Sequence, residues 1–147
     1  MTSAFVGLQN SLVAALASAP ALAGGRIYAN RLRPVSAAST TAVVVRLDKT
    51  EGLQMVIGAL DWTSAYSVEC YARAPGAGEP ATAIDQLLSD VWARLCALDA
   101  TALGAIDITV APRIDWQYDD SETPLVCAVI QLSVQHRTLP DSLQTWS

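Results

Sequence analysis

The sequence predicts a single α+β domain in which a mixed, mostly antiparallel sheet packs against two helices. Residues 66–73 alternate between apolar and polar side chains, which is typical of a half-buried strand. A stripe of apolar residues at helical spacing follows at 84–98, and further strand patterns lie on both sides of this pair. A chain of 147 residues can bury a core in one domain, residues 1–147, without disulfides or a metal.

The first segment predicts a helix that Ser3 caps and Pro20 ends. Its apolar face consists of Phe5, Leu8, Leu12, Val13 and Leu16. No Lys or Arg precedes Arg26, so the segment lacks the basic start of a secretory signal, and we expect a cytosolic protein that keeps this helix. A glycine pair then predicts a turn, followed by a short strand at 26–29 and an irregular stretch at 30–40.

A meander of three strands is expected next. Residues 41–47 are rich in β-branched side chains and predict a strand. Residues 48–52 form a predicted polar turn. Residues 53–60 fit a strand or a helix, and their flanks favour a strand. A turn at Asp61-Trp62-Thr63 leads into the strand at 65–73.

The second helix should follow a Pro/Gly loop at 74–80. Thr82 and Asp85 are close to a capping box at its start. Its apolar stripe is Ile84, Leu87, Leu88, Val91, Leu95 and Leu98. These residues predict a helix with one face on the sheet.

The C-terminal third predicts further strands. Residues 106–110 and 114–118 both alternate, with Pro112 as an interruption between them. A charged hairpin loop is expected at 120–124, before the longest strand, residues 125–137. Residues 138–147 are expected to form a C-terminal tail.

Composition limits the possible partners. Only 16% of the residues are charged and 52% are hydrophobic, which favours apolar surface hidden in an oligomer, although an Ala-rich monomer is the alternative. The net charge is −5, and Arg26, Arg31 and Arg33 are too few for a nucleic-acid footprint. No apolar stretch approaches the roughly 20 residues of a membrane span, so no membrane partner is expected.

The residues with catalytic or ligating potential do not form a known motif. Cys70, Cys96 and Cys127 are widely spaced, which excludes the usual zinc and thioredoxin-like patterns. His136 has no nucleophile motif beside it in the sequence, and a strand-end histidine without a catalytic task is the simpler reading. The glycines at 76 and 78 lack the Lys of a phosphate loop, and Glu79 would repel a phosphate. We expect no enzyme, no cofactor and no metal site.

The order of these features resembles the tail terminator (tail completion, minor tail) proteins of long-tailed bacteriophages. The resemblance spans roughly residues 2–137. It rests on the helix that ends in Gly24-Gly25-Arg26-Ile27-Tyr28, the strands at 42–46 and 66–73, the helix at 83–95, and Asp115-Trp116-Gln117-Tyr118-Asp119 before the long final strand.

The resemblance implies a hexameric ring at the head-proximal end of the tail tube, in the virion, assembled in the host cytoplasm. Such a ring stops polymerisation of the tail tube protein and presents a surface to the head-completion protein. DNA passes through its lumen without sequence-specific binding, and the acidic chain would not grip phosphates. The expected partners are therefore copies of this chain and those two proteins.

Charged residues near the predicted loops are the candidate assembly interface. They are Arg26, Arg31, Arg33, Lys49, Glu51, Asp119, Asp120 and Glu122. We expect the meander at 50–62 and the hairpin at 119–122 to project and to contact neighbouring subunits or the tube, because functional contacts often lie on such loops. The arginines are equally consistent with a solvated basic edge.

Two other functions fit the same residues. A head–tail connector or a tail tube subunit would fit the same order of predicted helices and strands. A small-ligand-binding α+β domain, from a different class, would need a deep pocket with convergent polar groups.

Overall fold

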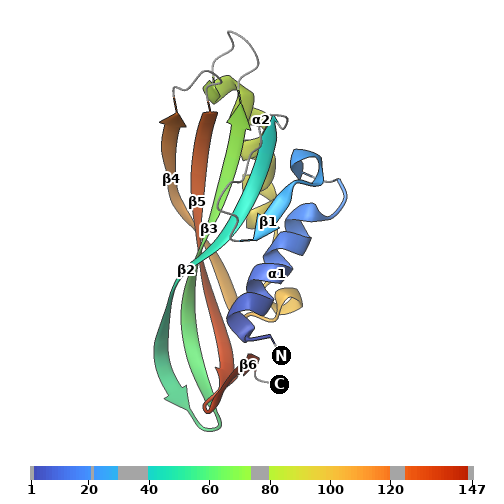
Figure 1. Cartoon of the computed structure of the whole chain (residues 1–147). Helices are drawn as coiled ribbons and strands as arrows, with labels where there is room; N and C mark the ends of the chain where they lie inside the picture. Colours follow the sequence, from blue (N-terminus) through green and yellow to red (C-terminus); the bar gives the residue numbers. More distant parts are fainter. Residues whose placement is uncertain (1, 21, 30–39, 74–79, 120–124, 146–147) are drawn as a thin grey trace.

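Two helices lie along one face of a long, twisted, six-stranded sheet (Figure 1). The computed structural model describes residues 2–20, 22–29, 40–73, 80–119 and 125–145. The elements are α1 (Ala4–Ala17), β1 (Ile27–Ala29), β2 (Thr41–Val56), β3 (Ala59–Arg73), α2 (Pro80–Cys96), β4 (Asp107–Asp119), β5 (Leu125–Leu139) and β6 (Ser142–Thr145). Short 3₁₀ turns occupy Leu22–Gly25 and Thr101–Leu103.

The strand order across the sheet is β1–β2–β3–β5–β4, and β6 pairs with the end of β5. Among the described strands, β1 and β2 run parallel and the other pairs are antiparallel. The predicted fold class, a mostly antiparallel α+β sheet with two packed helices, is therefore confirmed. Of the helices that the structure describes, neither is long and apolar enough to cross a membrane.

The core lies between the sheet and the two helices. The alternation predicted for β3 and β5 is confirmed, since every second residue of each is buried against the helices. These residues are Tyr66, Val68, Cys70 and Ala72 of β3, and Val126, Ala128, Ile130, Leu132 and Val134 of β5. The apolar stripe of α2 and Leu8, Leu12 and Leu16 of α1 complete the same cluster.

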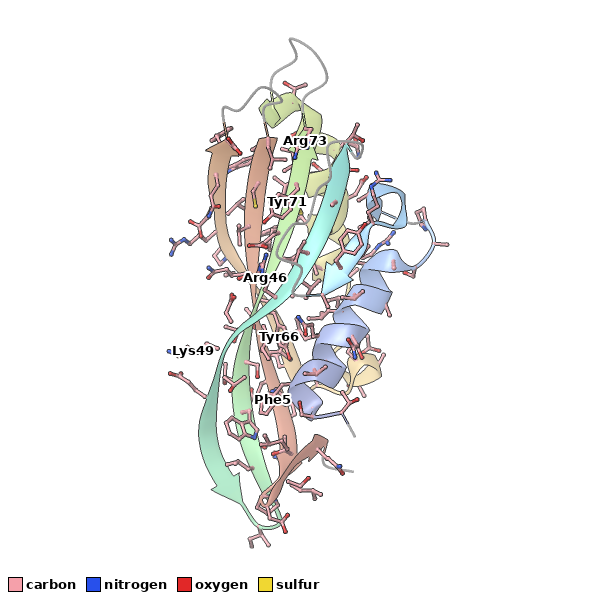
Figure 2. All side chains as sticks on the ribbon, viewed as in Figure 1. Phe5, Arg46, Lys49, Tyr66, Tyr71 and Arg73 are labelled. Atoms are coloured by element: carbon pink, nitrogen blue, oxygen red, sulfur yellow. The ribbon has the colours of Figure 1, made fainter. Side chains whose placement is uncertain are left out.

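Helix α1 is joined to the sheet by two buried hydrogen bonds. Ser3 caps the helix as predicted, because its Oγ accepts from the Val6 amide at 3.4 Å. The Tyr66 hydroxyl of β3 donates to the Phe5 carbonyl at 2.6 Å, and Figure 2 shows these two labelled side chains close together. Gln9 donates from Nε2 to the Val45 carbonyl of β2 at 2.8 Å. Both bonds give a buried side-chain donor a partner, since Tyr66 and Gln9 are almost completely buried.

Helix α2 differs from its prediction at both ends. It begins at Pro80, ahead of Thr82, so the predicted capping box at Thr82 and Asp85 is wrong. Proline suits the first turn of a helix, where its missing N–H has no helical partner anyway. The helix ends at Cys96, and Leu98 packs against the core from beyond it. The loop before α2, residues 74–79, lies outside the described residues.

The meander at 41–73 has one turn where two were predicted. Strand β2 continues through residues 48–52, and β3 includes residues 61–63, so both predicted polar turns are wrong. The chain reverses instead at Ile57 and Gly58, inside the strand predicted at 53–60, with Gly58 at a φ of +76°. The pairing of β2 with β3 shifts register between Leu47 and Lys49 and between Gly52 and Gln54, and β2 continues as a strand through both irregularities.

The C-terminal third also contains more strand than predicted. Strand β4 continues through Pro112, with an irregularity in its pairing to β5 between Val110 and Ile114. Proline is tolerated there because β4 is an end strand of the sheet. The expected tail at 138–147 contains the end of β5 and all of β6, which corrects that expectation. Residues 146–147 lie outside the described part.

Candidate assembly surface

The lower end of the β2–β3 hairpin projects beyond the helices. We call its residues, Thr50–Trp62, the hairpin arm. Figure 1 shows the arm, with the end of β5 beside it, extending past the first turn of α1. Ile57 at its tip is fully exposed, at 105% of the reference area. A large apolar side chain held at the end of an extended hairpin is a feature that a partner, and not the chain's own core, would bury.

Two charged candidates at the base of the arm, Lys49 and Glu51, form a local pair. Lys49 Nζ and Glu51 Oε1 are 2.8 Å apart, and both side chains are about two-thirds exposed (67% and 63%). Glu51 accordingly raises the pKa of Lys49 through their hydrogen bond. Figure 2 shows Lys49 pointing away from the helices. A pair this exposed contributes little to stability and remains accessible to a partner.

Arg26 lies at the opposite side of the sheet from β4, just before β1. Its Nε donates to the Thr41 carbonyl at 2.7 Å and its guanidinium donates to Thr41 Oγ1 at 3.1 Å. These bonds connect the turn at Leu22–Gly25 to the start of β2, so Arg26 has a structural task. Both acceptor oxygens are neutral, so neither bond compensates the positive charge.

Strand β4 is the last described strand at its side of the sheet, and it carries exposed aromatic side chains. Trp116 pairs with Ala128 and Tyr118 with Val126, so both aromatic residues face the side that the helices cover. They nevertheless remain 43% and 58% exposed. A groove of about 370 Å³ adjoins this strip, lined by Leu88, Ser89, Trp92 and Ile114. Ile114 therefore packs against the core beside α2, whereas Trp116 and Tyr118 remain largely exposed.

The face of the sheet away from the helices carries a polar network. Arg46 Nε lies 2.5 Å from Glu69 Oε1, and the Tyr71 hydroxyl donates to the same oxygen at 3.1 Å. Burial raises the pKa of Tyr71. Figure 2 shows Arg46 and Tyr71 on adjacent strands. Because the members satisfy one another, this network is a structural feature of the sheet surface.

His136 pairs with a serine inside the protein. Its Nε2 lies 2.7 Å from Ser64 Oγ, and the Phe5 ring packs edge-on at 5.1 Å. Burial lowers the pKa of His136 to about 4, so the ring is neutral at pH 7. Serine next to histidine is a nucleophile–base arrangement, but the two side chains are only 0% and 1% exposed. A substrate cannot reach the hydroxyl in this conformation.

The cysteines and surface cavities do not assemble a ligand site. Cys70 and Cys127 are buried, which raises the pKa of both thiols, and Cys96 is exposed on α2. Within the described ranges, no three His, Cys, Asp or Glu side chains are placed to hold a metal ion. A cavity of about 460 Å³ lies beside Arg94, but that guanidinium already donates to the carbonyls of Leu16, Ser18 and Pro20 at 2.7–3.0 Å.

The four described residues among the eight interface candidates do not converge on one site. Lys49 and Glu51 meet on β2, Arg26 lies near β1, and Asp119 ends β4 at the other edge. Arg31, Arg33, Asp120 and Glu122 lie outside the described residues. Sequence reasoning missed the exposure of Ile57, Trp116 and Tyr118. The alternation of Ile114, Trp116 and Tyr118 was visible, but only the structure shows that the last two remain exposed.

Comparison of the sequence with protein-family models finds no match, and comparison with curated proteins finds none either. The function proposed below therefore depends on the residues of this chain and on their arrangement.

Proposed function

We propose that the chain is a structural subunit that caps the head-proximal end of the tail tube in a long-tailed bacteriophage. Six copies form a ring that stops growth of the tube and offers a joining surface to the head-completion protein. The chain acts in the virion tail after assembly in the host cytoplasm. It uses no cofactor and performs no catalysis.

The main observation behind this proposal is the projecting hairpin arm. A ring that docks on a tube needs a rigid element that reaches beyond its own fold, and the arm extends past α1 with Ile57 fully exposed at its tip. Pairing along both strands holds the arm straight, from Thr50 opposite Ser64 to Val56 opposite Ala59. The arm would contact a neighbouring subunit or the tube protein.

The surface of the domain supports assembly as well. The end strand β4 has no described strand paired on its outer side, and it exposes two aromatic side chains. Surfaces that combine an open edge with aromatic residues are typical of protein–protein contacts. The net charge of −5 would keep DNA moving freely through a lumen, because DNA affinity grows with each Lys or Arg that neutralises a phosphate.

Deleting the gene from the phage that encodes the chain tests the proposal. Electron micrographs of the lysate should show tails of irregular, mostly excessive length that are not joined to heads. A plasmid copy of the gene should restore uniform tails with heads. Uniform, head-joined tails without the gene would overturn the proposal.

The purified protein separates the alternatives. Negative-stain images and light scattering should show closed six-membered rings, alone or on the ends of added tail tubes. Open tubes would indicate a tube subunit. A monomer that ignores tube ends and whose melting temperature rises with a small ligand would indicate the binding domain.

A further inference from the structure

The first turn of α1 covers the base of the hairpin arm. We call this turn and its cap, residues 3–8, the clasp. The Phe5 ring packs edge-on against Trp62 of β3 and against His136 of β5, with ring centroids 5.2 and 5.1 Å apart. The Tyr66 hydroxyl, which burial keeps neutral by raising its pKa, donates to the Phe5 carbonyl at 2.6 Å (Figure 2). These contacts join α1 to the two strands where they leave the cover of the helices.

His136 lies under the clasp with one ring nitrogen unpaired. Its Nε2 is 2.7 Å from Ser64 Oγ, whereas Nδ1 is buried and has no hydrogen-bond partner in the structure. A neutral imidazole carries one N–H, but an imidazolium carries two, and here only the Ser64 oxygen could accept from it. A buried charge without partners is unfavourable, so the space under the clasp fits the neutral ring alone.

No charged side chain of the described residues faces the ring from the elements packed around it. Helix α1 contains no charged residue at all. Asp61 and Arg137 alternate to the face of the sheet away from the helices, where they pair with each other at 2.5 and 3.1 Å. Asp107 of β4 lies opposite Gln135, on that same face, and β6 (Ser142–Thr145) has no titratable residue. An imidazolium would therefore gain no counter-charge in the closed structure.

Of the elements around His136, the clasp is held most weakly. Strand β5 pairs continuously with residues 60–73 of β3, and Trp62 Nε1 also donates to Thr138 Oγ1 at 2.9 Å. The clasp lies at the start of a helix, where the first amides lack helical carbonyl partners and the end opens readily. Its described hydrogen bond to the sheet comes from Tyr66, and the next one, from Gln9, lies beyond it. The clasp can therefore lift without breaking the sheet.

We propose that uptake of a proton from solvent by His136 opens the clasp. The first turn of α1 then lifts from the sheet, water reaches the imidazolium, and Trp62 at the base of the arm becomes exposed. Loss of the proton lets Phe5 pack back over the two rings. The fold thus contains an acid-sensitive joint between α1 and the hairpin arm, and this proposal does not depend on the function proposed above.

The size of the response follows from the two environments of the ring. Burial under the closed clasp lowers the pKa of His136 to about 4 from its ordinary value of 6.5. Water around the open clasp restores the ordinary pKa. The ratio of open to closed molecules should therefore rise about twentyfold from pH 7 to pH 5.

Amide hydrogen exchange measured by NMR tests the proposal. The amides of Gly7 and Leu8 report on the clasp, and those of Val68 and Ile130 report on the covered part of the sheet. Protection factors, corrected for the intrinsic exchange rate at each pH, should be lower in the clasp than in the sheet at both pH 7 and pH 5. The protection of the clasp should fall by about tenfold or more between these two values.

Two variants separate the proton from the other contacts of the clasp. His136→Gln keeps a polar partner for Ser64 but does not titrate, so protection of the clasp should no longer depend on pH. Tyr66→Phe serves as the control, because it removes the bond to Phe5 and leaves His136 in place. Its clasp should be less protected at both pH values and should still respond to acid.

Two exchange results would overturn the proposal. Clasp protection in the wild-type chain that does not change with pH would show that the turn opens without uncovering His136. Clasp protection equal to that of the sheet at each pH would show that the turn opens only when the whole chain unfolds.

A titration of the wild-type ring adds a test that needs no variant. His136 is the only histidine of the sequence, so its ring signals in the NMR spectrum identify themselves. The ring should remain neutral well below pH 6.5 while the clasp is closed. A ring that titrates near its ordinary pKa while the clasp stays protected would overturn the proposal, because the closed structure would then accommodate the charge.

Discussion

Strands β2 and β3 each serve two different environments. Near residues 43–45 and 66–72 they lie under the helices, and their inward side chains are completely buried. In the hairpin arm the same two strands continue past the first turn of α1, where Glu51, Gly52, Ile57 and Gly58 are exposed. Backbone pairing between β2 and β3 is nearly continuous across both halves, with two register shifts.

The strand register is fixed in a different way in each half. Under the helices, burial of alternate side chains fixes the register, because a slip by one residue would turn apolar groups to solvent. In the arm, register depends on the turn at Gly58 and on continuity with the buried half. The covered half should therefore determine stability, and the arm should tolerate change to its side chains.

Truncation of one apolar residue in each region is the strongest test of this contrast. Leu12→Ala removes a side chain that is 1% exposed between α1 and the sheet, and it should lower the free energy of unfolding by about 2–5 kcal/mol. Ile57→Ala at the arm tip should change it by less than about 0.5 kcal/mol. Urea unfolding followed by circular dichroism measures both values. A comparable loss from both would mean that the arm folds as part of the core.

Acidification tests the boundary between the two regions, where His136 faces Ser64 and Phe5. The pKa of His136 is about 4 in the folded chain and about 6.5 when unfolded, so between these values the unfolded chain binds more protons. Stability should therefore fall as the pH drops through this window. From pH 7.5 to pH 5 the loss due to His136 should be about 2 kcal/mol.

His136→Gln isolates that loss from the titration of other groups. The amide keeps a polar partner for Ser64 but does not titrate, so its unfolding free energy should depend less steeply on pH between 7.5 and 5. Parallel pH dependence in the two proteins would mean that His136 is hydrated and titrates normally in the folded state.

The covered half of the fold was predictable because it is periodic. The faces of β3, α2 and β5 followed from alternation and helical spacing, and Ser3 was recognisable as a cap. The arm was mispredicted because Asp48–Gly52 and Asp61–Thr63 have the composition of turns, while tertiary pairing holds them in strands. Local composition could not show that β3 would hold one side of β2 along its whole length.

The candidate surface was predictable only in part. Lys49 and Glu51 were recognised as charged residues near a projecting hairpin, although they lie on a strand and not in a turn. The exposure of Trp116 and Tyr118 depends on how α2 packs on the sheet, and spacing within β4 contains no information about that.

The two tyrosines of β3 test the two faces of the covered half. Tyr66→Phe removes the buried hydrogen bond to the Phe5 carbonyl and should cost about 1–1.5 kcal/mol. Tyr71→Phe removes a bond to Glu69 on the face away from the helices and should cost about 0.5 kcal/mol or less, because water can replace it. Chemical denaturation of both variants gives the comparison. A larger loss of unfolding free energy from Tyr71→Phe would mean that the polar network contributes more to stability than the buried hydrogen bond of Tyr66.

Two glycines of the arm provide the finest test, because the same substitution should act in opposite directions. Gly58 has a φ of +76°, and although a Cβ would meet open space there, an alanine would be strained by about 1 kcal/mol. Gly52 has no such φ, and a Cβ would lie at an ordinary contact distance of 3.9 Å from the Trp62 ring. Gly52→Ala should therefore stabilise the chain by about 0.4–1 kcal/mol, mainly by restricting the unfolded state. Equal changes in stability would mean that the turn adapts to an alanine at position 58 without strain. Strand pairing alone would then determine the direction of the arm.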